Sequence, residues 1–115
     1  MLITGLDSVK RFTPVMEGAE KISKQIPLSK ADGAPNFSFR VFTIQPGGHT
    51  PLHRHAFEHL NYIIEGQGVL VAEGQEHEIK QGDFAMVLAG ELHQYKNMAK
   101  SGDLVLICAV PKEYE

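Results

Sequence analysis

The chain of 115 residues has one cysteine, no tryptophan, no long hydrophobic run and no surplus of basic residues. Cys108 cannot form an intrachain disulfide, and the apolar run from 104 to 110 around it predicts a buried thiol. That run is too short to span a bilayer. The 11 Lys and Arg against 14 Asp and Glu give a net charge of -3, which disfavours a nucleic-acid partner.

Export signals are also missing from the N-terminal segment. Residues 1 to 12 show no basic segment followed by an apolar stretch and a small-residue cleavage site, so we expect a cytoplasmic protein without a membrane partner. The length and the 43% hydrophobic content suit one domain over 1–115. Within it we expect N-terminal strands in 1–34 and a barrel core in 35–110.

Short segments of alternating apolar and polar residues, separated by Gly and Pro, predict strands rather than helices. The clearest strand is expected to end at a turn over 45–48. The pattern is typical of an all-β antiparallel barrel or jelly roll. A helical turn or two between Val15 and Lys24 is a less favoured alternative, because Gly18 interrupts it. The eight predicted strands cover 19–29, 37–44, 60–64, 68–72, 76–79, 84–88, 93–97 and 104–110.

Histidine placement is the main indication of chemistry. His53, His55 and His59 share one parity, so along a strand they would project to the same side, whereas Glu58 would point the other way. His93 opens a later strand and could reach the same place from across a barrel. Converging imidazoles bind Zn, Mn, Fe, Co or Ni, although a lone His-x-His pair is more often a surface or core feature.

The residues from 47 to 97 resemble the two motifs of the cupin superfamily. The first motif reads Gly, five residues, His-x-His, three or four residues, Glu, six residues, Gly. The second reads Gly, five residues, Pro-x-Gly, two residues, His, three residues, Asn. The matching positions are Gly47, His53, His55 and Gly66, then Gly82, Gly90, His93 and Asn97. The resemblance implies a double-stranded β-helix and, as in small bacterial cupins, a homodimer.

Two positions depart from the cupin pattern. Leu88 stands where the motif has Pro, and His59 stands where it usually has Glu. Either a ligand is lost or a fourth imidazole replaces it; strand parity favours replacement, with Glu58 as the rival ligand. We therefore expect one divalent transition-metal ion (Mn, Fe, Ni, Co or Zn), and the expected ligands are His53, His55, His59 and His93.

Four neutral imidazoles would leave the metal charge uncompensated, so the site should attract anions. Six-fold coordination would leave two open positions, which suits a metal-dependent oxygenase or isomerase acting on a small anionic or oxygenated molecule. A non-catalytic module that binds or senses a sugar or a small acid is the alternative. A closed tetrahedral zinc site would be structural.

Several other side chains are expected to serve packing or solvent contact. Asn61 and Tyr95 should face the interior, with Tyr95 more often a packing residue than a proton donor. Arg40 either anchors an anion inside or faces solvent, and the solvent-facing interpretation is favoured. Met86 and the phenylalanines are expected in the core or the pocket wall.

Overall fold

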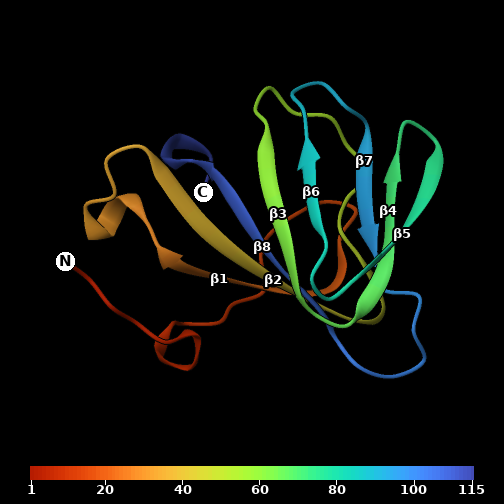
Figure 1. Cartoon of the computed structure of the whole chain (residues 1–115), viewed down its shortest axis with the longest axis horizontal. Coiled ribbons are helices and arrows are strands. Elements are labelled where there is room, and N and C mark those ends of the chain that lie inside the picture. Colours follow the sequence, from red (N-terminus) through yellow and green to blue (C-terminus); the bar gives the residue numbers. More distant parts are fainter.

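Eight antiparallel strands curl into one sheet in the computed structural model, which describes residues 1–115 (Figure 1). The order is β5-β4-β7-β2-β8-β3-β6, and β1 pairs with β2. All eight predicted strands are present, and the expected all-β antiparallel barrel is confirmed. The strands are β1 (Glu20–Leu28), β2 (Phe37–His49), β3 (His59–Glu65), β4 (Gln67–Ala72), β5 (Gln75–Lys80), β6 (Phe84–Val87), β7 (His93–Lys96) and β8 (Leu104–Pro111).

Helical structure is limited to three short 3-10 turns, Leu6–Ser8, Lys30–Asp32 and Lys112–Tyr114. None of them has the length or the apolar character needed to cross a membrane. Of the N-terminal strands expected in 1–34, the structure contains one, β1. The helical alternative between Val15 and Lys24 is wrong, because β1 occupies the second half of that segment.

Strand β2 continues through the segment that was predicted to be a turn. Gly47 has a φ of 81°, and the pairing of β1 with β2 shifts register in this region. The Gly47 N–H donates to the Asn97 carbonyl at 3.0 Å, and the Asn97 N–H donates to the Gly48 carbonyl at 3.0 Å. The glycines therefore bend the strand, as in a β-bulge, and do not reverse it.

The interior of the sheet changes from apolar to polar along its strands. Ile44, Leu104 and Leu106 are almost completely buried and form the apolar core with other inward side chains of β2 and β8. Along β3 the buried residues are Ile63, Asn61 and His59 in turn, because alternate residues of a strand face the same side. The interior end of β3 that carries His59 is thus polar.

Two residues of the cupin motifs hold the fold together. Asn97 is buried and donates from Nδ2 to the carbonyls of Ile44 and Gly102, both at 2.9 Å. Gly66 has a φ of 84°, and a Cβ placed there would lie 2.2 Å from the Asp103 carbonyl oxygen. The motif requires these residue types for backbone geometry and buried hydrogen bonds.

The outer face of the sheet carries exposed apolar side chains. Phe39, Ala109, Leu60 and Met86 pair in register across β2, β8, β3 and β6. The prediction that Met86 and all phenylalanines belong to the core or pocket wall is wrong for five of them. Four lie on strands whose alternation points the side chain outward, and Phe12 lies before β1, outside the named strands. The exposed members of that set are Phe12, Phe37, Phe39, Phe84 and Met86.

Candidate metal centre

Two separate parts of the chain supply the candidate ligands. His59 opens β3 and His93 opens β7, whereas His53 and His55 lie in the irregular segment between β2 and β3. The first three histidines therefore do not lie on one continuous strand, which is the condition that the parity argument needed. Instead, His53 and His93 form an isolated β-bridge, in which each backbone N–H donates to the other residue's carbonyl at 3.2 and 3.1 Å.

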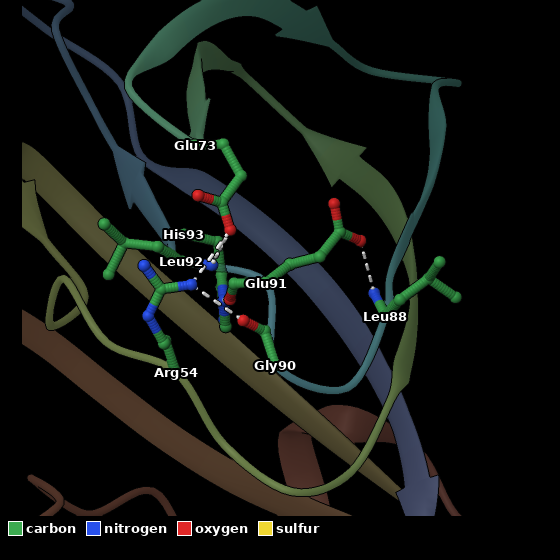
Figure 2. Close-up of polar contacts among 7 residues, drawn as sticks. All are labelled: Arg54, Glu73, Leu88, Gly90, Glu91, Leu92 and His93. Carbon is green, nitrogen blue, oxygen red and sulfur yellow. Dashed lines mark hydrogen bonds and ion pairs between the residues drawn. The ribbon is translucent and has the colours of Figure 1, made fainter.

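Arg54 ties the segment of the first two histidines to the approach to His93 (Figure 2). Its Nη1 donates to Glu73 Oε1 at 3.0 Å and to the Gly90 carbonyl at 2.9 Å. The same Glu73 oxygen accepts from the Leu92 N–H at 2.9 Å, and this bond, followed by the charge of Arg54, lowers the pKa of Glu73. The two segments are thus held in fixed relation outside the cavity.

Leu88, which replaces the motif proline, takes part in the same loop. Its N–H donates to Glu91 Oε1 at 2.7 Å, as Figure 2 shows. A proline has no N–H and could not make this bond. The departure from the motif therefore adds a hydrogen bond to the turn that leads into β7.

The structure brings all four imidazole rings together. Ring centroids lie 5.0 Å apart for His53 and His55, 4.9 Å for His53 and His93, 4.8 Å for His55 and His93, 5.1 Å for His55 and His59, and 5.0 Å for His59 and His93. His53, His55 and His93 have ligand atoms within 4.8 Å of one another. The group defined by these ligand atoms has three members and not the expected four, because it does not include His59. His59 is nevertheless adjacent, since its Nε2 lies 3.2 Å from His93 Nε2.

Backbone carbonyls fix the protonation of two of these rings. His55 Nδ1 lies 2.7 Å from the Phe57 carbonyl oxygen, and His93 Nδ1 lies 2.8 Å from the Glu91 carbonyl oxygen. A carbonyl oxygen can only accept, so each Nδ1 carries the proton of the neutral ring and each Nε2 keeps a lone pair. Metal-binding histidines in proteins are usually oriented in this way.

Asn61 fixes the third ring, that of His59. Its Nδ2 donates to the Ile107 carbonyl at 3.2 Å, which turns Oδ1 toward His59 Nδ1 at 2.9 Å and the Tyr95 hydroxyl at 2.7 Å. Because an amide oxygen only accepts, His59 Nδ1 carries the proton and Nε2 keeps the lone pair. The sequence-based expectation that Asn61 and Tyr95 face the interior is confirmed.

The contact between His59 Nε2 and His93 Nε2 therefore joins two lone pairs, without a proton to share. Such an approach is unfavourable unless a cation lies beside both atoms. Two nitrogens at about 2.0–2.1 Å from one metal ion lie about 2.8–3.4 Å apart when their angle is between about 90° and 110°. The observed 3.2 Å fits shared coordination of one ion.

The histidines are also held in the neutral state that binds metals. Burial is the main cause that lowers the pKa of His53 to about 4 and that of His59 to about 3. Burial likewise lowers the pKa of His55. At neutral pH these rings are therefore unprotonated, and a cation would not have to displace protons from them.

The rings line a cavity of about 130 Å³, called here the histidine cavity. This volume is about four times the share of one water molecule in the liquid, so a small ligand fits. Glu58, the rival ligand, is exposed. The cavity is lined by Met16, Arg40, Phe42, Thr50, His53, His55, Phe57, His59, Asn61, His93, Tyr95, Leu106 and Cys108.

Arg40 is buried in this cavity, so the favoured prediction that it faces solvent is wrong. It shares its parity on β2 with Phe42 and Ile44, which both face inward. That parity was visible in the sequence, but the general preference of arginine for the surface outweighed it. The predicted burial of Cys108 is confirmed.

Comparison with known proteins agrees with this architecture. A family model described as "Cupin domain" matches residues 40–110. An oxalate-binding protein of Thermotoga maritima is 30% identical over 96 residues, which are 83% of this chain and 74% of that protein.

Two solved structures are similar over most of the chain. The polyketide cyclase RemF from Streptomyces resistomycificus is 26% identical, with a TM-score of 0.91, over 96% of this chain and 79% of that one. A sugar phosphate isomerase of the cupin superfamily from Silicibacter pomeroyi is 25% identical, with a TM-score of 0.80, over 95% of this chain and 75% of that one. With the family model covering more than half of its residues, the chain belongs to the cupin family.

Proposed function

We propose that this cupin binds one divalent transition-metal ion through His53, His55, His59 and His93, and that it acts on a small anionic or oxygenated molecule in the histidine cavity. The observation that carries the proposal is the fixed tautomer of three rings, which leaves the lone pairs of His59 and His93 facing each other at 3.2 Å. Bound there, the ion would supply Lewis acidity toward an oxygen of the substrate.

The charge of the cavity supports an anionic ligand. Its lining contains four histidines and one arginine, but no aspartate or glutamate. The positive charge of an ion in the cavity would therefore not be offset by the protein, and anions are the ligands that such a charge favours. The name of the Thermotoga relative, an oxalate-binding protein, also points to a small acid.

Tyr95 serves to hold Asn61 and is not placed to transfer protons. Its hydroxyl donates to Asn61 Oδ1 at 2.7 Å, and burial raises its pKa. It therefore stays a protonated phenol whose proton is already used. Phe42 and Leu106 give the cavity apolar walls, and electrostatic contacts of a ligand are stronger beside such walls than in bulk water.

A non-catalytic protein that binds or senses a small acid is the second candidate. The observation that favours it is the same lack of a carboxylate in the lining, because a reaction with proton transfer usually needs a titratable group near the substrate. The oxygenase-like and isomerase-like functions remain the catalytic alternatives. They differ from the binding function in that they form a product.

The test begins with protein purified without a histidine tag and reconstituted in turn with Mn, Fe, Co, Ni and Zn. We expect about one equivalent of metal in the wild type and a large loss in His93→Ala. The loaded protein is then incubated with oxalate aerobically and anaerobically. Consumption of oxalate supports an enzyme, binding without product supports the second candidate, and failure of every metal to bind would contradict the proposal.

A further inference from the structure

Arg40 is a buried cation without a carboxylate partner. It is 9% exposed and belongs to neither of the ion pairs in the structure. Nη2 donates to Cys108 Sγ at 2.7 Å, Nη1 donates to the Tyr114 carbonyl at 3.4 Å, and the buried Nε has no partner. A thiol is a weak acceptor and 3.4 Å is long for this bond, so most of the donor capacity of the guanidinium is unused.

A second cation lies on the same side of the sheet. Lys24 Nζ is 5.7 Å from the centroid of the Phe42 ring, and Arg40 Cζ is 5.2 Å from it. Burial, followed by the charge of Arg40, lowers the pKa of Lys24. Glu115 is the carboxylate that acts on Lys24, but its Oε2 accepts from the Ser38 hydroxyl and the Lys30 N–H and forms no ion pair with Arg40. The charge of Arg40 is thus not neutralised by a direct partner.

Arg40 and the four histidines line one cavity of about 130 Å³. A guanidinium offers a planar fork of N–H donors that matches the two oxygens of a carboxylate. We propose that Arg40 binds the carboxylate of a small organic acid in the histidine cavity, so that the acid lies between the guanidinium and the metal of the proposed function, on which this inference rests. The class of ligand is a carboxylic acid of a few heavy atoms, such as a short dicarboxylate.

This role explains why an unpaired cation is kept in the interior. A buried charge without a partner lowers the stability of the folded state, whereas the same charge gains a strong, charge-assisted bond when an anion enters. Residues kept for binding often reduce stability in this way. A purely structural role, in which Arg40 supports the C-terminal turn through the Tyr114 carbonyl, predicts that its removal destabilises the protein and leaves anion binding intact.

The experiment measures oxalate binding by calorimetry to wild type, Arg40→Met, Arg40→Lys and the control Arg11→Met. Arg11 is an exposed arginine whose only side-chain bond is a long one to Ser23, at 3.4 Å, so its variant removes the same charge away from the cavity. We expect Arg40→Met to weaken the oxalate Kd on the order of 10- to 100-fold. The Kd of Arg40→Lys should lie between those of wild type and Arg40→Met, since lysine keeps the charge but lacks the planar fork of donors. The Kd of the control should stay within about twofold of wild type.

Thermal unfolding and metal content are measured on the same samples, the latter after titration because free oxalate also chelates metal. We expect Arg40→Met to keep the metal and to unfold at the same or a higher temperature than wild type. If Arg40→Met does not fold, the comparison of Arg40→Lys with wild type carries the test. Oxalate binding by Arg40→Met that equals wild type would overturn the inference while the metal site stands.

The titrations are repeated on metal-free protein to separate the two proposals. If no variant binds metal but oxalate affinity still falls in Arg40→Met, the proposed metal function is wrong and the role of Arg40 stands. If wild type holds metal but binds none of oxalate, glyoxylate or malonate, the role of Arg40 is overturned and the metal site stands. A loss of stability in Arg40→Met with unchanged affinity would assign Arg40 to the fold alone.

Discussion

Replacing Asn61 with alanine should weaken both folding and metal binding, and comparison with a second buried asparagine separates the two effects. The change removes three buried hydrogen bonds, to His59 Nδ1, the Tyr95 hydroxyl and the Ile107 carbonyl. At about 1 kcal/mol for each bond lost, we expect the free energy of unfolding to fall by about 3 kcal/mol. His59 also loses the acceptor that keeps its proton on Nδ1, so metal affinity should fall about 10- to 100-fold.

Asn97→Ala is the matched control, since Asn97 is as buried as Asn61. It also makes three hydrogen bonds, to the carbonyls of Ile44 and Gly102 and to the Ala99 N–H, and none involves a histidine. Denaturant unfolding of both metal-free variants should give similar losses of stability. Metal affinity, measured by titration against a chelating indicator, should fall for Asn61→Ala only. Equal metal affinity in the two variants would refute the claim that Asn61 sets the tautomer of His59.

Three further predictions concern stability and assembly. The folded pKa values of His53 and His59, about 4 and about 3, lie below the usual 6.5, so the unfolded chain binds more protons in acid. Unfolding experiments on metal-free protein should therefore show full stability above pH 6.5 and a progressive loss as the pH falls toward 4; equal stability at pH 7 and pH 4 would contradict this.

Gly66→Ala should lower the free energy of unfolding more than Gly82→Ala in denaturant unfolding. Both glycines have positive φ, which costs about 1–3 kcal/mol for another residue, but only at Gly66 would a Cβ also clash with backbone. Equal losses of stability would show that the close approach at Gly66 is unimportant. The exposed apolar side chains on the outer face of the sheet, Met86 among them, offer a surface for the expected homodimer. Light scattering should therefore find a dimer for wild type and a monomer for Met86→Glu. A monomeric wild type would contradict this prediction.

Much of the fold was predictable because alternation of apolar and polar residues has the period of a strand, and all eight strands were found from it. The turn assigned to 45–48 was wrong, since a glycine with positive φ serves a bulge as well as a turn. Period alone also does not tell which face of a strand is covered. For that reason Met86, on an apolar outer face, was wrongly assigned to the interior or pocket wall.

The candidate site was predictable in its histidines but not in their surroundings. His53, His55 and His93 meet as the motif spacing indicates, and His59 faces inward while Glu58 is exposed. The acceptors that fix the rings of His55 and His93 are backbone carbonyls in irregular segments, and no residue pattern encodes such positions. That His59 is the fourth ligand stays a prediction.

The most direct test of that prediction is the X-ray absorption spectrum at the metal edge of the loaded protein, recorded for wild type, His59→Ala and Glu58→Ala. We predict scattering from four imidazoles in wild type and Glu58→Ala, and from three in His59→Ala. A wild-type spectrum with three imidazoles that does not change in His59→Ala would contradict the four-histidine metal site.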